Sequence, residues 1–407
     1  MKRFLSLLLA VLILLSCCPA AFAAGSEKNA DPTKLCLLTE QLFGLCRHLR
    51  TDSESFRFVE NLKIGWNLGN TFDAYDEEER VEDELDYETV WCGVETTREL
   101  IAEVKNAGFN TVRIPVSWHN HLTDEENYTI SEAWLARVNE VVDYCIAEGL
   151  YVILNIHHDD GKDYLYPTKA KQDQSVKYIT AIWTQLADRF KDYDEHLIFE
   201  SMNEPRLVGS VFEWALIPII PSCVEAVRQI NVLNQAFVNA VRATGGNNET
   251  RYLLCPGYDA SADGATDLSY RIPDDPVCND RRIIVAVHAY TPDSFAHSLI
   301  GTSRWSSKSI IDRLQVTVFM DKLYYKYILK GIPVLLDEFG ALDKNGNTAS
   351  RVDYAGFYVA SARARGMSCL WWDNNIMSGD GERFGLLDRE TLEWVYPEIV
   401  QAMMDNA

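Results

Sequence analysis

Residues 198–206 read IFESMNEPR, an apolar run that passes directly into an amide, a carboxylate and a proline. The mostly apolar run 196–202 is typical of a buried strand. A charge just past the end of such a strand is either a solvated loop residue or a group that is held there for chemistry. Pro205 cannot continue a strand ladder, because proline has no backbone N–H. The role of Glu204 therefore depends on what the other predicted strands carry at their ends.

Apolar runs alternate with amphipathic segments along most of the 407-residue chain. The runs predict strands at 62–66, 111–116, 151–156, 197–202, 252–255, 283–287, 333–336 and 368–372. Segments with helical periodicity lie between them, for example at 97–107, 132–147, 176–190, 224–243, 310–329 and 353–363. Glycine closes several of them, at Gly108, Gly149, Gly331 and Gly366, as expected of a helix C-cap.

Eight strands that alternate with helices predict an α/β protein with a single (β/α)8 TIM barrel. A doubly wound sheet is the alternative, and it would carry a glycine-rich phosphate loop after its first strand. The sequence GWNLGN at 65–70 does not fit that loop.

The N-terminal residues have the features of an export signal. Lys2 and Arg3 precede a mostly apolar stretch at 4–15, and in the sequence AFA at 21–23 the small residues Ala21 and Ala23 fit a cleavage site. We therefore expect a signal peptide at 1–23, a tether with one helix at 24–55, and the barrel at 56–407. The protein would be secreted, with a lipoprotein anchor at Cys17 as the alternative. No later hydrophobic stretch approaches the ~18 residues of a membrane span, so we expect no membrane-spanning segment after removal of the signal.

Composition narrows the classes of partner. The formal net charge is −22, so neither nucleic acid nor an anionic membrane surface is an expected partner. Aromatic residues make up 11% of the chain and include 10 Trp, which suit flat apolar ligands such as sugar rings. An even number of cysteines follows the signal, which permits disulfides without fixing their pairing. Cys145, Cys255 and Cys369 lie in apolar segments and are more simply buried thiols.

Polar and aromatic residues gather at the C-terminal ends of the predicted strands, where TIM barrels carry their active sites. They are Trp66 and Asn67, Arg113, His157 and His158, Asn203 and Glu204, His288 and Tyr290, Asp337 and Glu338, and Trp371 and Trp372. Glu204 and Glu338 are carboxylates that end buried runs. Glycoside cleavage needs such a pair, one as a proton donor and the other as an ionised nucleophile.

These residues carry a resemblance to glycoside hydrolase family 5, the cellulase family. The motifs are GWNLGNTFD, TVRIPVSW, VILNIHHD, FESMNEP, VHAY, LDEFG and WWDN, in the order typical of the family, from about Phe58 to the C-terminus. The first and last resemble the branch of bacterial endo-β-1,4-glucanases and xyloglucanases. The resemblance implies a secreted, retaining, endo-acting enzyme for β-1,4-glucan: cellulose, carboxymethylcellulose, mixed-linkage glucan or xyloglucan. An endo-β-1,4-mannanase or xylanase of the same fold is the alternative.

Carried over residue by residue, the resemblance implies roles for these positions. Glu204 would be the general acid/base and Glu338 the nucleophile, which Arg113 would keep ionised. The supporting residues would be Asn203 on the sugar 2-OH, His157 beside the cleaved bond, His288 near Glu204, Tyr290 on Glu338 and Trp372 as a stacking floor. Weaker candidates for substrate contact are Asn67, Asn70, Trp66, His119 and the branch-specific His158. Glu200 and Trp371 are expected to be structural, with Trp371 packed against the helices.

Two other classes of protein remain open. A metal-dependent hydrolase is suggested by HHDD at 157–160, although adjacent histidines face opposite sides of a regular strand, so only one would point inward. Metal-reversible loss of activity with a chelator would favour it. A catalytically silent sugar-binding barrel would instead release no reducing sugar from any β-glucan. We expect no cofactor, no metal, a monomer, and a β-linked polysaccharide as the partner.

Overall fold

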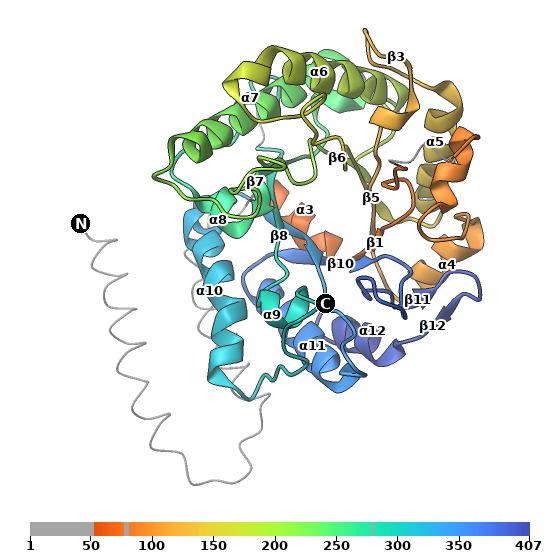
Figure 1. Cartoon of the computed structure of the whole chain (residues 1–407), viewed down its shortest axis with the longest axis vertical. Helices are drawn as coiled ribbons and strands as arrows, with labels where there is room; N and C mark the ends of the chain where they lie inside the picture. The colour runs from red at the N-terminus through yellow and green to blue at the C-terminus, as the bar shows by residue number, and fades with distance from the viewer. Residues whose placement is uncertain (1–52, 77–80, 279–280) are drawn as a thin grey trace. The chain divides into compact units, whose positions relative to one another are not determined.

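Eight parallel strands close into a barrel in the computed structural model, which describes residues 53–76, 81–278 and 281–407 (Figure 1). The strands are β1 (Ile64–Leu68), β2 (Thr111–Ile114), β5 (Tyr151–Asn155), β6 (Leu197–Glu200), β7 (Leu253–Ser261), β8 (Ile283–His288), β9 (Val334–Phe339) and β10 (Ser368–Asp373). Their order around the barrel is β1-β10-β9-β8-β7-β6-β5-β2. Every predicted strand overlaps one of these eight strands, so the prediction of a TIM barrel is confirmed.

Helices surround the barrel on its outer side (Figure 1). They are α4 (Arg98–Asn106), α5 (Glu132–Ala147), α6 (Gln172–Arg189), α7 (Pro221–Ala243), α8 (Ala262–Thr266), α9 (Asp293–Ala296), α10 (Ile310–Lys326), α11 (Thr348–Ala364) and α12 (Pro397–Met404). Two hairpins, β3 (Leu122–Asp124) with β4 (Thr129–Ile130) and β11 (Leu387–Asp388) with β12 (Glu393–Trp394), lie outside the barrel sheet. All four glycines that were predicted to end helices have positive φ, which the left-handed C-cap favours.

Helix α3 (Glu54–Leu62) packs against the inward-facing residues of several strands. Ser53 caps it, because its side chain accepts a hydrogen bond from the N–H of Phe56. Phe58 and Leu62 belong to one buried cluster with residues of β5 to β10, and the ring of Phe58 stacks on that of Tyr252 with centroids 3.6 Å apart. α3 directly precedes β1, so it covers the end of the barrel at which the parallel strands begin.

Three strands end earlier than predicted: β2 at Ile114, β5 at Asn155 and β6 at Glu200. Beyond β6 the backbone bonds change partner: the N–H of Ser201 donates to Leu254 O at 3.0 Å, whereas that of Asn203 donates to Ile156 O at 2.8 Å. Because consecutive bonds no longer go to one neighbouring strand, Glu204 lies on a loop rather than at a strand end.

The predicted signal peptide, the Cys17 anchor and nearly all of the predicted tether lie outside the described residues. Within the described residues, no helix has both the length and the apolar character needed to cross a membrane. Cys145, Cys255 and Cys369 are buried free thiols, as predicted.

Truncation of Phe58 tests the packing of α3. Phe58→Ala should reduce the free energy of unfolding by about 3–5 kcal/mol, because a buried aromatic side chain would be replaced by a cavity. Glu54→Ala on the same helix is the control: it removes a surface ion pair with Arg282 (2.9 Å) and should cost about 0–1 kcal/mol. Urea unfolding of the two variants measures both effects, and a loss below 1 kcal/mol for Phe58→Ala would contradict this account of α3.

Candidate active site

Arg113 lies at the centre of the polar residues at the C-terminal ends of the strands. It is fully buried on β2 and forms a two-point ion pair with Glu200 of β6, at 2.6 Å (Nε to Oε2) and 2.9 Å (Nη2 to Oε1). Nη1 donates to Glu338 Oε1 at 2.5 Å and to Asn67 Oδ1 at 3.0 Å. Nη2 also donates to Asn203 Oδ1 at 2.9 Å. Bidentate pairing fixes the plane of a guanidinium, so Glu200 orients Arg113 toward Glu338, in agreement with its expected structural role.

Glu338 has a hydrogen-bond donor on each carboxylate oxygen. It lies within β9, opposite His288 of β8 in the strand ladder. Oε1 accepts from Arg113, and Oε2 accepts from the hydroxyl of Tyr290 at 2.9 Å. Burial, and to a lesser degree the charge of Glu204, raise the pKa of Glu338 above its ordinary value, although His288, Arg113 and the Tyr290 hydrogen bond oppose this rise. Donors of this kind favour the ionised carboxylate, which is the state that a nucleophile requires.

Glu204 faces Glu338 across a short gap that His288 bridges. His288 Nδ1 lies 2.8 Å from Glu204 Oε1 and 3.5 Å from Glu338 Oε2. One carboxylate oxygen of each glutamate lies within 4.8 Å of the other. Burial raises the pKa of Glu204, and burial lowers the pKa of His288 to about 4, so this imidazole is neutral near pH 7. Glu204 therefore retains a proton more readily than an exposed glutamate does.

His157 and His158 both lie beyond β5, which ends at Asn155. Strand alternation therefore does not decide which of them points inward, because alternation stops where the strand stops. Their rings are 4.5 Å apart, and one atom from each lies within 4.8 Å of a carboxylate oxygen of Asp73. Burial lowers the pKa of both histidines, that of His158 to about 3. The sequence argument against a metal ion at HHDD therefore no longer holds. A chelator experiment would distinguish a metal-dependent hydrolase from a glycosidase that needs no metal.

Trp372 is mostly covered, with 8% of its surface exposed. Its ring is parallel to that of His157, with 3° between the planes and 5.7 Å between the centroids. Gly69 permits this arrangement, because a Cβ there would lie 2.7 Å from the indole. The neighbouring Trp371 is fully buried, contacts Phe339 of β9 edge-on at 5.4 Å, and has the guanidinium of Arg351 on α11 6.0 Å from its ring centroid, in agreement with its expected packing role.

Trp66 and Asn67 are fully buried, so the expectation that they contact substrate is wrong. Both belong to β1, in which successive side chains face opposite sides. Asn67 faces the barrel interior, where its amide donates to the carbonyl of Asp337 at 3.0 Å and orients Arg113. Trp66 packs against the guanidinium of Arg389, which lies 5.0 Å from its ring centroid.

Asn70 and His119 are half-buried. The N–H of Asn70 donates to Asp73 Oδ2 at 3.1 Å, and Asn70 has a positive φ of 58°. His119 Nδ1 lies 2.5 Å from Asp159 Oδ1, a fully buried carboxylate that fixes the orientation of the ring. Both remain candidates for substrate contact.

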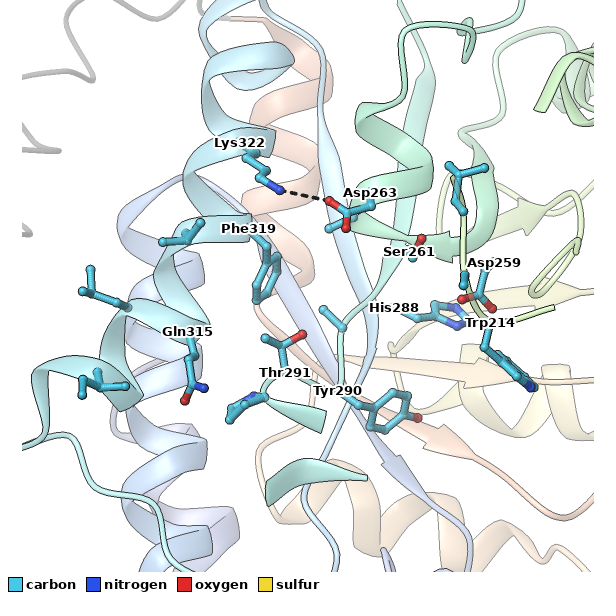
Figure 2. Close-up of a pocket in the computed structure, with 18 residues that line it drawn as sticks. Trp214, Asp259, Ser261, Asp263, His288, Tyr290, Thr291, Gln315, Phe319 and Lys322 are labelled. Atoms are coloured by element: carbon cyan, nitrogen blue, oxygen red, sulfur yellow. Dashed lines mark hydrogen bonds and ion pairs between the residues drawn. The ribbon is translucent and has the colours of Figure 1, made fainter. Parts of the chain in front are cut away.

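The sequence analysis missed four side chains beside these groups. Tyr75 and Trp91 lie against His158, with ring centroids 5.5 Å and 5.8 Å from it. Trp214 and Asp259 line a pocket that also includes His288 and Tyr290 (Figure 2). Trp91 and Trp214 stand in loops that follow β1 and β6, and tryptophan in a loop beyond a barrel strand was an available signal.

Replacement of Tyr290 tests the electrostatics of Glu338. Tyr290→Phe removes a hydrogen bond to the ionised carboxylate, so the pKa of Glu338 should rise. If the reaction needs Glu338 ionised, the acidic limb of the pH–activity profile on a soluble β-glycoside should lie at higher pH in the variant than in the unmodified protein. Tyr358→Phe, which loses a buried hydrogen bond to Ala289 O at 3.1 Å, is the matched control. An acidic limb that stays in place in Tyr290→Phe would contradict the assignment.

Comparison with known proteins places the chain in a family. The cellulase model of glycosyl hydrolase family 5 matches residues 74–378. The cellulase/esterase CelE of Acetivibrio thermocellus is 40% identical over 411 residues, which cover 100% of this chain and 47% of that protein. The chain therefore spans about half the length of this relative.

Solved structures give the same grouping. A family 5 lichenase from Caldicellulosiruptor sp. F32 has 55% sequence identity and a TM-score of 0.86, covering 88% of this chain and 96% of its own. A xyloglucan-specific endo-β-1,4-glucanase from a metagenomic library has 40% identity and a TM-score of 0.78, covering 87% and 99% of the two chains. Because the family model covers well over half of its residues, this chain belongs to glycosyl hydrolase family 5, the cellulase family.

Proposed function

We propose that this chain is a secreted, retaining endo-β-1,4-glucanase. The observation that carries the proposal is the pair Glu204 and Glu338, whose nearest oxygens lie within 4.8 Å of each other with His288 between them. The candidate substrates are β-1,4-glucans, including mixed-linkage glucan and xyloglucan. The lichenase and the xyloglucan-specific endoglucanase among the similar structures support this class of substrate.

The first step would form a covalent glycosyl-enzyme. Glu338 attacks the anomeric carbon while protonated Glu204 donates its proton to the departing glycosidic oxygen. Arg113 and Tyr290 hold the attacking carboxylate in place, so little reorganisation is needed when it reacts. The short oxygen–oxygen gap leaves little room for a water molecule poised behind the sugar, which supports the proposal of a retaining mechanism.

The second step would release the sugar. Glu204, now ionised, takes a proton from a water molecule whose oxygen attacks the same carbon, and Glu338 leaves as a carboxylate. Asn203 would hydrogen-bond the 2-OH, since Arg113 occupies its carbonyl oxygen and so directs its NH2 group elsewhere. Two inversions at one carbon give net retention of configuration.

Removal of the proposed proton donor should lower activity most on substrates whose leaving group needs a proton. Glu204→Ala should lower activity on β-glucan by ~10²-fold or more, while the glycosylation step on an activated aryl glycoside should be less affected. Rapid-quench measurement of that step on both substrates provides the test. Glu195→Ala, an exposed glutamate at the opposite end of β6, is the control. Equal losses on both substrates would argue against Glu204 as the acid.

The stereochemistry of the product tests the role of Glu338. Freshly released reducing ends should be the β-anomer, because a double displacement restores the configuration of the substrate. Proton NMR during the first minutes of hydrolysis would detect this before mutarotation equilibrates the anomers. Initial release of the α-anomer would mean an inverting enzyme and would refute the nucleophile assignment.

A further inference from the structure

A pocket of about 770 Å³ lies on the side of the barrel formed by β7 and β8 (Figure 2), and it is lined by His288, whose Nδ1 atom is 2.8 Å from Glu204 Oε1. Its lining includes His288 and Tyr290 of the active site, Trp214 from the loop between β6 and α7, and Asp259 near the end of β7. Apolar side chains of α10 form the far wall. This volume is typical of a small-molecule binding site.

Trp214 is exposed but held in place. It is 64% exposed, and it lines the same pocket as His288 and Tyr290. The guanidinium of Arg206 lies 4.1 Å from its ring centroid, and Arg206 Nη1 also donates to the carbonyl oxygen of Glu204 at 3.0 Å. A single side chain thus connects the indole to the backbone of the proposed proton donor.

The loop that carries Trp214 is anchored to the barrel. The buried hydroxyl of Tyr258 accepts a hydrogen bond from Leu207 N–H at 3.1 Å and donates to Phe212 O at 2.6 Å. Arg206 also pairs with Glu213 at 3.4 Å. An exposed aromatic ring on an anchored loop is preorganised for binding, which reduces the entropy lost when a ligand is bound.

Asp259 is directed into the same pocket by an unusual backbone. Asp259 and Ala260 have φ values of 57° and 41°, both in the left-handed region that non-glycine residues rarely adopt. The register of β7 against β8 shifts between Pro256 and Ser261. The N–H of Asp259 donates to Pro205 O at 2.9 Å, which joins this turn to the residue that follows Glu204. Strained backbone of this kind concentrates at functional sites.

The carboxyl group of Asp259 is suited to a neutral polar ligand. Its Oδ1 atom is buried and has no hydrogen-bond partner within the described part of the chain. Burial, and then the charge of Glu204, raise the pKa of Asp259 to about 9. The group is therefore protonated near pH 7 and can both donate and accept a hydrogen bond, as a sugar hydroxyl can.

We propose that Trp214 and Asp259 form the binding site for the sugar on the leaving-group side of the cleaved bond. The indole face stacks on the sugar ring, and the carboxyl of Asp259 hydrogen-bonds one of its hydroxyl groups. The placement follows from the chemistry: the proton donor must face the leaving group, and both residues connect to the segment 204–206 that carries it. Trp372 and His157 belong to β10 and to the segment after β5, away from this pocket. The inference rests on the proposed glycosidase function.

Two substrates that differ only beyond the cleaved bond test it. Asp259→Ala and Trp214→Ala should each lower kcat/KM on cellotetraose by about 10- to 100-fold, since each removes a contact to a leaving-group sugar. On β-cellobiosyl fluoride, which has no sugar there, the change should be about threefold or less. Asp259→Asn keeps the shape of the side chain and should give an intermediate loss. Asp188→Asn, an exposed aspartate on α6, is the matched control.

The possible outcomes separate clearly. Equal losses on cellotetraose and on the fluoride in correctly folded variants would overturn the inference while leaving the glycosidase function intact. A shift in the alkaline limb of the pH profile in Asp259→Asn would also overturn it, because Asp259 would then act through the pKa of Glu204. If the unmodified protein cleaves neither substrate, the proposed function fails first.

Discussion

The buried charge of Arg113 constrains the active site more than any other single group. Moving a guanidinium out of water is costly unless every donor finds a partner, and breaking a buried ion pair costs about 3–5 kcal/mol. Arg113 meets this requirement with two carboxylates and two amide oxygens from β1, β6, β9 and the loop after β6. The positions of Asn67, Glu200, Asn203 and Glu338 therefore depend on one another.

This arrangement also suits a nucleophile whose charge disappears during the reaction. In the proposed reaction Glu338 would form an ester with a sugar, and Arg113 would then lose one anionic partner in a water-poor interior. The bidentate bond to Glu200 remains, at 2.6 Å and 2.9 Å, so the guanidinium is still paired. Glu200 is fully buried, so it would not contact a substrate, yet it would make the proposed covalent intermediate less costly. The sequence indicated only that Glu200 was structural; its partner became clear from the barrel geometry.

Much of the fold and of the inner active site could be predicted because both follow from periodicity. Eight apolar runs alternating with helices define the barrel, and parallel strands bring the residues at their C-terminal ends together. The errors arose where strand boundaries were misjudged. The alternation of side chains along a strand was assumed for His157 and His158, although both lie beyond the end of β5. It was not assumed for Trp66 and Asn67, although both lie within the regular strand β1. The ends of a strand are set by backbone hydrogen bonds to the neighbouring strands, and the apolar pattern of a single sequence does not show where those bonds stop.

The leaving-group side was beyond prediction for a different physical reason. The left-handed turn at Asp259 and Ala260 accompanies the close packing of α8 on the end of β7, where a Cβ on Gly264 would lie 2.0 Å from Tyr258 O. No local pattern of apolar residues encodes such a contact.

Glu204 and Glu338 are held by different parts of the structure. Glu338 is fixed within a strand by the buried network of Arg113, whereas Glu204 follows a strand on a segment joined to Arg206, Trp214 and Asp259. In the proposed reaction, substitutions in that outer segment would change which leaving groups are accepted without disturbing Glu338. The reason is that no ion pair or hydrogen bond between described residues links Arg206, Trp214 or Asp259 directly to Arg113.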